Sequence, residues 1–380
     1  MDISLSTSAK IPAVLALVFL SALAFGEEAL TVSGQLIAGS LSGTAGKMEF
    51  AAPAGRVSLD QIARIAFKKS GDKVPLVSGV MTRDGSVVRG RIAVGQGDII
   101  SVSSSRLGTL EVPLSEIARL YFQCRRPLSN PQECGIHLRN GDFLSADTVV
   151  LNRAAVSVHS ILGVVEVPIE RVAVVTLSTL NTPRQESGDV SVLLENDDIL
   201  RGNAVSLDPQ LSVATAFGDV AVKSDSMCGM DFPARMKYVS ELPLTVSTRG
   251  IAPEGVKYVF LDEAPEGRLS VNGLIWRKGL YIRSGGVVEA TLPAGGQRLF
   301  FIPAVAESAN PPSGKLTVEA DAVEIFSAVI NNDAEAKPVI LDVSGRKSIR
   351  LVFRSEPSGL IGSAVILGDA LVTVSPTRKE

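Results

Sequence analysis

A repeat with a period of 55 residues fills the first half of the chain. The segments EVPLSEIARLYF and EVPIERVAVVTL end at Phe122 and Leu177, and related segments end one period away, at Phe67 and Phe232. The same step separates three turn glycines: Gly108, Gly163 and Gly218. A sequence period of this length is typical of repeat proteins, in which each unit is one supersecondary element that packs on its neighbours.

The sequence pattern predicts about five short β-strands in each unit. Turn signals such as Asp84-Gly85 and Asn140-Gly141 separate stretches in which apolar and polar residues alternate, for example VVRGRIAV. Pro113 and Pro168 lack the backbone N–H that a strand ladder needs, so the strand must bend or end at each of them. Strands this short bury one face only if they curl into a small barrel or pack on the next unit. The layout is similar in pattern to Sm-like small barrels.

We therefore expect an all-β chain whose first part is a series of small β-barrel or meander units. Their predicted bounds are residues 27–74, 75–130, 131–186 and 187–235. The first unit is predicted to be incomplete, because little precedes Val32–Gly39, the counterpart of Val88–Gly95. Either Glu27–Thr31 supplies a short first strand or another segment completes the sheet, since terminal repeats are often atypical.

The N-terminus has the pattern of a targeting segment. Lys10 precedes the apolar run Ile11–Phe25, and small residues stand in cleavage register at Ala22, Ala24 and Gly26. We expect residues 1–26 to be a cleaved signal peptide, the alternative being an uncleaved anchor. No later stretch is long and apolar enough to span a bilayer. This predicts an exported protein, located in the periplasm, on the cell surface or outside the cell, with no transmembrane segment after cleavage.

Export changes how the three cysteines are interpreted. Cys124 and Cys134 flank a nine-residue polar loop and could form a disulfide in an oxidising compartment. Cys228 is left over in an apolar run, where a buried, unreactive thiol is expected.

The sequence contains no enzyme signature. His137 occupies a repeat position that carries Met81 and Leu193 in neighbouring units, which indicates packing rather than catalysis, and His159 is interpreted in the same way. Without an imidazole partner a serine or cysteine triad is not expected. Three cysteines and two histidines give no metal-ligand spacing. A net charge of −3 with scattered basic residues gives no field that would attract nucleic acid.

The C-terminal part contains a set of motifs that occur in order. MKYVSEL (Met236–Leu242) and Asp262 precede LSVNGLIWRKGLYIRS, which ends at Ser284, and VILDVSGRKSIRLVF (Val339–Phe353) follows. Together they resemble the NPCBM family of carbohydrate-binding modules over about residues 236–376. The resemblance implies a jelly-roll, galactose-binding-like β-sandwich over residues 236–380 and a role in binding carbohydrate.

Four residues of this region are candidates for ligand binding. Trp276, Tyr281 and Arg283 fall within eight residues, and strand alternation places Tyr281 and Arg283 on one face. Aromatic rings can cover the apolar side of a sugar, while charged groups such as Arg283 and Asp262 can bind its hydroxyls. The alternative is that Trp276 fills the core of the sandwich and that Tyr281–Arg283 is an ordinary strand surface.

The chain also departs from the family pattern. Members commonly carry a histidine after KG-h-x, where this chain has Tyr281-Ile282. They commonly end with an acidic D-H-x-D-W turn, where this chain has Gly362–Ala370 with Asp369 as its one acidic residue. These changes are expected to affect ligand binding more than the fold, because packing positions still alternate.

The interpretation is an exported, non-catalytic carbohydrate-binding protein whose C-terminal sandwich recognises a polysaccharide or other glycan. The alternative is a structural or assembly protein of the cell envelope whose β-repeats bind other proteins, and turnover of a polysaccharide would indicate a hydrolase instead. We expect no cofactor, and nothing in the sequence supports a calcium site.

Overall fold

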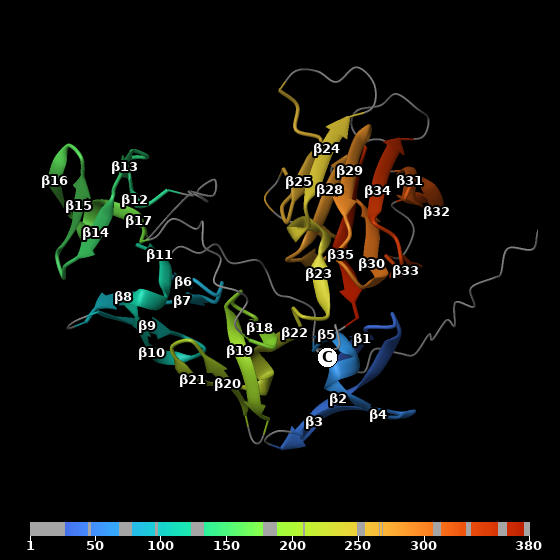
Figure 1. Cartoon of the computed structure of the whole chain (residues 1–380), viewed down its shortest axis with the longest axis horizontal. Helices are drawn as coiled ribbons and strands as arrows, with labels where there is room; N and C mark the ends of the chain where they lie inside the picture. Colours follow the sequence, from blue (N-terminus) through green and yellow to red (C-terminus); the bar gives the residue numbers. More distant parts are fainter. Residues whose placement is uncertain are drawn as a thin grey trace, which may run out of the picture.

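The computed structural model is all-β, and its regular elements are strands and 3-10 helices of three residues. It describes residues 27–44, 47–67, 78–95, 98–122, 133–177, 188–207, 210–248, 255–265, 267, 269–306, 313–331, 336–355 and 363–375. The predicted signal peptide and Cys124 lie outside these residues. Among the described residues no helix is long and apolar enough to cross a membrane. The all-β prediction, with small repeated units before a C-terminal sandwich, is confirmed (Figure 1).

Four related units, which we number 1 to 4 in chain order, share one succession of elements. Unit 1 contains β1 (Glu27–Thr31), β2 (Leu36–Thr44), β3 (Lys47–Ala52), β4 (Gly55–Ser58), η1 (Leu59–Gln61) and β5 (Ile62–Ala66). Unit 2 contains β6 (Gly79–Thr82), β7 (Val87–Arg89), β8 (Arg91–Val94), β9 (Ile99–Ser104), β10 (Gly108–Pro113), η2 (Leu114–Glu116) and β11 (Ile117–Tyr121). Unit 3 contains β12 (Gly135–Leu138), β13 (Phe143–Ser145), β14 (Thr148–Leu151), β15 (Ala155–Ser160), β16 (Gly163–Pro168), η3 (Ile169–Arg171) and β17 (Val172–Thr176). Unit 4 contains β18 (Val190–Leu194), β19 (Ile199–Ser206), β20 (Leu211–Thr215), β21 (Gly218–Val222), η4 (Ser224–Ser226) and β22 (Met227–Asp231).

In each unit the last strand pairs with the first, and the first with the second. In units 1 and 4 the pairing continues through the third and fourth strands, as in β22-β18-β19-β20-β21, whereas units 2 and 3 each have a separate three-stranded sheet, β8-β9-β10 and β14-β15-β16. Among the described residues no pairing joins the fourth strand to the last, so the unit does not close into a barrel. The second strand bends where Gly90 and Gly202 lie against a neighbouring strand; a Cβ at Gly202 would lie 2.2 Å from the carbonyl oxygen of Ala214. Glu27–Thr31, whose role the sequence leaves open, forms the first strand of unit 1.

The units pair through their last strands rather than in chain order. β5 of unit 1 pairs with β22 of unit 4, and β11 of unit 2 pairs with β17 of unit 3, both antiparallel. In each pair equivalent residues of the repeat face each other, Leu120 opposite Val175 and Ile65 opposite Met230. Each pair is therefore related by an approximate two-fold axis. Strands from all four units form a 16-stranded sheet in which the units follow each other in the order 3, 2, 4, 1.

Units 2 and 4 meet through equivalent corners. Val87 and Ile199 are bridge partners, and Asp198 accepts a hydrogen bond from the backbone N–H of Arg89 at 2.7 Å. In the other direction the backbone N–H of Arg201 donates to Oγ of Ser86 at 2.9 Å. The equivalent positions in units 1 and 3 carry Ser33 and Ser145. An arginine therefore occupies this repeat position only in the two units that form the central contact.

The titration of Asp198, which lies in this contact, should make the free energy of unfolding depend on pH. Burial raises the pKa of Asp198, although hydrogen bonds from Arg89 and Asn196 lower it in part. A carboxyl with a raised pKa in the folded state binds its proton more tightly there, so stability falls as the pH rises from the ordinary aspartate pKa to the raised value. Asp198→Asn removes this titration. We expect the free energy of urea unfolding of the wild type, relative to D198N, to decrease across that window and to level off above it. A difference that increases with pH would show the opposite sign.

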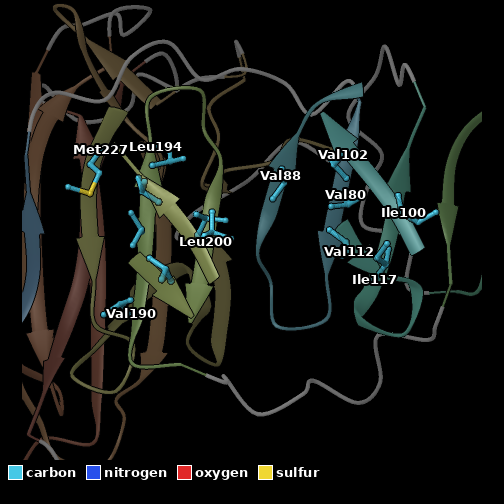
Figure 2. Packing of buried hydrophobic residues seen from close by; sticks show 14 of the residues in the cluster. Val80, Val88, Ile100, Val102, Val112, Ile117, Val190, Leu194, Leu200 and Met227 are labelled. Atoms are coloured by element: carbon cyan, nitrogen blue, oxygen red, sulfur yellow. The ribbon is translucent and has the colours of Figure 1, made fainter. Parts of the chain in front are cut away.

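Valine, leucine and isoleucine side chains fill each unit from the inside. Figure 2 shows two of these cores, with Val80, Val102 and Ile117 inside unit 2 and Leu194 and Leu200 inside unit 4. All five residues are 0% exposed. Such burial is the main favourable term that holds short strands together.

The C-terminal sandwich consists of two antiparallel sheets. The first sheet has the order β25-β28-β35-β30-β33, with β23 also paired to β35, and the second has the order β24-β29-β34-β31-β32. The strands of the first sheet are β23 (Met236–Tyr238), β25 (Val259–Leu261), β28 (Gly279–Arg283), β30 (Gly296–Val305), β33 (Val339–Asp342) and β35 (Ala364–Val374). Those of the second are β24 (Leu244–Thr248), β29 (Gly286–Thr291), β31 (Ser313–Ala320), β32 (Val323–Asn331) and β34 (Ser348–Ser355). The 3-10 helix η5 (Val239–Glu241) and the hairpin β26 (Leu269–Val271) and β27 (Leu274–Trp276) complete the domain.

The core of the sandwich lies between the two sheets. Phe301 of the first sheet and Phe353 of the second are fully buried there, together with Leu351 and Val372. Along β34 buried and more exposed residues alternate at first, as expected for a strand with one face on the core.

The first sheet of the sandwich is also packed on unit 1. Leu30 and Ala63 of unit 1 form a small buried cluster with Tyr238, Phe300 and Leu371. Hydrogen bonds fix the orientation of the two parts: the side chain of Thr373 donates to the carbonyl of Val32 at 2.7 Å, and that of Arg298 donates to the carbonyl of Ser33 at 3.1 Å. The sandwich thus covers the turn that follows the first strand of unit 1.

Candidate functional site

The outer face of the first sheet carries an aromatic layer beneath the β26–β27 hairpin. Trp276, at the end of β27, is 5% exposed, and its indole lies on Gly368 of β35, where a Cβ would come within 2.3 Å of the ring. Leu269 and Ile366 belong to the same buried cluster. The tryptophan therefore anchors the hairpin to the sheet. Stacking of a sugar on either face of its ring would require the side chain to move.

Tyr281 and Arg283 lie on β28 in the same layer. Tyr281 is 4% exposed, and its ring meets Phe260 edge to face with centroids 5.6 Å apart. The guanidinium of Arg283 lies over the ring of Phe260 at 5.6 Å, and the ammonium of the exposed Lys257 lies 4.5 Å from it. Phe260, which is partly exposed, is thus the aromatic residue of this layer that reaches the surface beside two cations.

Asp262 organises a turn. Its backbone φ is 57°, and its carboxylate accepts hydrogen bonds from the backbone N–H of Gly279 at 3.0 Å and from Nζ of Lys278 at 2.8 Å. Glu241 also pairs with Lys278, at 3.1 Å. Burial lowers the pKa of Lys278, but Asp262 and Glu241 outweigh it, so that the pKa is raised overall. The ammonium is therefore held as a charged link between η5, β28 and the Asp262 turn.

The structure brings Trp276 and Tyr281 into one buried cluster and places Arg283 at its border, whereas Asp262 is engaged with Lys278. The ligand roles predicted for these four residues stay predictions. Sequence reasoning missed Phe260 and Lys257. The sequence does indicate that Phe260 lies on a strand, because an aromatic residue near the centre of the short run KYVFLD suits a β-strand. That Phe260 lies beside Tyr281, however, follows only from the pairing of β25 with β28.

The region around Asp369, where the sequence departs from the family pattern, lies inside β35 and forms a contact within the chain. Asp369 has a φ of 51°, which interrupts the strand between its pairing with β28 and with β23. Its carboxylate accepts from Nη1 of Arg64 in unit 1 at 2.9 Å. Arg64 is also 3.4 Å from Asp231 of unit 4, and the hydroxyl of Tyr238 donates to Asp231 at 2.8 Å. Burial raises the pKa of Asp231 although Arg64 and Tyr238 lower it in part.

His137, Cys134 and Cys228 lie in the repeat units, outside the sandwich. His137 stacks on Phe143 with ring centroids 4.5 Å apart, and burial lowers its pKa. Cys228 is buried, and burial raises the pKa of the half-buried Cys134. No group of three or more His, Cys, Asp or Glu residues that could hold a metal ion occurs within the described part of the chain.

Comparison with known proteins places a family domain on the sandwich. Residues 235–373 match the family model of the NPCBM/NEW2 domain, which confirms the resemblance seen in the motifs. No curated protein matches the chain.

Similar solved structures include several carbohydrate-binding modules. CBM51 from Clostridium perfringens GH95, in complex with methyl-galactose, is 20% identical, with 36% of this chain and 99% of that chain covered and a TM-score of 0.31. The tandem CBM51 modules of Sp3GH98, the family 98 glycoside hydrolase from Streptococcus pneumoniae, are 14% identical, with 91% and 88% covered and a TM-score of 0.31. TmCBM61 in complex with beta-1,4-galactotriose is 17% identical, with 34% and 87% covered and a TM-score of 0.21.

Proposed function

We propose that the protein is exported and binds a polysaccharide or other glycan through its C-terminal sandwich, without catalysing a reaction on it. The observation that carries this proposal is the match of residues 235–373 to the NPCBM/NEW2 domain, over the residues that fold as the sandwich. The absence of an enzyme motif from the sequence supports a binding role.

The surface that we assign to the glycan is formed by Phe260, Arg283 and Lys257. The partly exposed ring of Phe260 offers an apolar face for the C–H groups of a pyranose. The guanidinium of Arg283 and the ammonium of Lys257 carry only donors, which suit the hydroxyl and ring oxygens of a sugar. Tyr281 supports the Phe260 ring from the side, and Trp276 and Asp262 hold the hairpin and the turn that border this surface. These three residues would then act by positioning rather than by contact.

Substitutions on this surface test the assignment. Phe260→Ala and Arg283→Ala should each weaken retention by the bound polysaccharide roughly tenfold, which corresponds to about 1.4 kcal/mol. Phe326→Ala and Arg354→Ala provide matched controls, because the substitutions remove the same side-chain types and both residues lie on the second sheet. Affinity electrophoresis gives the dissociation constants, and circular dichroism shows that each variant is folded. If all four variants bind as the wild type does, the glycan surface lies elsewhere.

A further inference from the structure

One corner of the repeat unit is an interface wherever units 2 and 4 meet. The corner consists of the first turn, the start of the second strand and the turn between the third and fourth strands. In unit 2 the latter turn carries Arg106, which forms an ion pair of 3.0 Å with Glu195 of unit 4. Leu107 and its counterpart Phe217 are both partly buried. Asp198 is fully buried against Arg89.

The same corner of unit 3 is open among the described residues. Its turn carries Ile161 and Leu162, which are 93% and 94% exposed, and Val164 and Val165 beside them are 60% and 52% exposed. Exposed apolar side chains that are grouped in this way mark interaction sites on protein surfaces. The strand β13 at this corner also ends the 16-stranded sheet, and sheet ends offer unpaired backbone groups.

The first turn of unit 3 keeps the geometry that unit 4 uses for binding. Asn140 donates to Asp142 at 2.6 Å, as Asn196 donates to Asp198 at 2.7 Å. The difference is in burial, because Asp142 is exposed whereas Asp198 is 0% exposed. The turn is therefore already shaped to accept a backbone N–H from a neighbouring unit.

We propose that this corner of unit 3 binds the same corner of unit 3 in a second copy of the chain, forming a two-fold dimer. The contact between units 2 and 4 shows that two such corners are complementary to each other about an approximate two-fold axis. In the dimer Asp142 accepts the backbone N–H of Ser145 from the other copy, as Asp198 accepts that of Arg89. Closed two-fold dimers with one self-complementary patch are the commonest form of oligomer.

The side chains of unit 3 fit this partner. In unit 3 the repeat counterpart of Arg106 is Ile161, and the counterpart of its partner Glu195 is Arg139. An arginine at position 161 would therefore face the like charge of Arg139 from the other copy. An apolar turn avoids this repulsion and buries Ile161 and Leu162 on the partner. Unit 4 shows the same combination, since its turn is Ala216-Phe217 and the counterpart of Glu195 in unit 2 is Arg83.

Sedimentation velocity of the full chain from residue 27 tests the dimer. We expect the wild type to sediment as a dimer at micromolar concentration and the double variant I161D/L162D to sediment as a monomer, with at least about a 100-fold rise in the dissociation constant. Val329→Asp is the matched control, because Val329 is a 54% exposed valine on the sandwich, and it should leave the dimer intact. A wild type that stays monomeric up to about 100 μM, or a double variant that dimerises as strongly as the wild type, would overturn the proposal.

A cysteine substitution tests the axis itself. Val87 and Ile199 are bridge partners in the contact between units 2 and 4, and their counterpart in unit 3 is Phe143. In the proposed dimer Phe143 faces Phe143 of the other copy, at the Cβ separation of about 4.5–5.5 Å typical of paired strands. Phe143→Cys should therefore form a disulfide-linked dimer under mild oxidation, whereas Val329→Cys should not. A dimer that F143C does not crosslink has another interface, and this outcome is independent of whether the sandwich binds glycan.

Discussion

Replacing Arg64 with alanine should lower the stability of the assembled chain by about 3–5 kcal/mol at neutral pH, the cost typical of breaking a buried ion pair from one side. Arg64 joins three parts of the molecule, because it lies in unit 1 and pairs with Asp231 of unit 4 and Asp369 of the sandwich. The side chains of Arg64 and Asp231 are 16% and 8% exposed. Without the guanidinium, two carboxylates stay in a poorly solvated contact with no opposing charge.

The pH dependence of this defect follows from the same groups. Burial already raises the pKa of Asp231 in the wild type, and Arg64 is the main group that lowers it. In R64A that pKa rises further, so the folded variant takes up a proton at a higher pH and its stability recovers as the pH falls. Urea unfolding at a series of pH values should show the deficit largest at neutral pH and smaller in acid. Arg56→Ala is the control, since the pair of Arg56 with Glu49 is on the surface and is expected to contribute less than about 1 kcal/mol. Equal losses in R64A and R56A would mean that the buried network does not hold the parts together.

The second large effect is expected at Gly368. A Cβ there would lie 2.3 Å from two carbon atoms of the Trp276 indole, a rigid neighbour that cannot yield locally. We expect Gly368→Ala to displace the tryptophan and the β26–β27 hairpin, with a loss of about 3 kcal/mol from overpacking and exposed apolar surface. Because Trp276 is the one tryptophan of the chain, its fluorescence reports the displacement directly as a red shift and greater quenching by iodide.

Two further variants distinguish the effect of this clash from the effect of replacing any strand glycine with alanine. Gly296→Ala is made in the neighbouring strand β30, where the nearest atom to the new Cβ is a carbonyl oxygen at 3.2 Å, and it should cost less than about 1 kcal/mol. The second is the double variant G368A/W276A. If the clash is the cause, adding G368A to W276A should cost much less than adding it to the wild type. A fluorescence spectrum of G368A identical to that of the wild type would exclude the displacement.

The repeats could be predicted from the sequence much better than their arrangement. The 55-residue step marks equivalent residues, and short alternating runs mark the strands, so each unit follows from local information. The order 3, 2, 4, 1 does not, because every unit offers the same last strand for pairing. The one local trace of the order is the repeat position that carries Arg89 and Arg201 in the units that meet centrally but serine in the other two.

The candidate site could not be predicted fully from the sequence, because it depends on contacts between residues that are far apart in the chain. The motifs locate the sandwich, and Trp276 is 5% exposed in the cluster on the outer face of the first sheet rather than in the core between the two sheets. The burial of Tyr281 depends on the hairpin that Trp276 anchors, and its contact with Phe260 depends on the register of β25 on β28. Asp262 and Asp369 both have positive φ, so their turn and bulge positions are explained by the backbone as well as by their charge.

The measurement that tests the central proposal most directly is affinity electrophoresis of the full chain through gels that each contain one polysaccharide from a broad panel, with and without added calcium. We expect at least one polysaccharide to retard the wild type saturably, to the same extent in calcium and in a chelator, and to retard F260A and R283A less. Migration unchanged by every polysaccharide, by a chain shown to be folded, would contradict carbohydrate binding, and cleavage of a polysaccharide in the gel would contradict a purely binding role.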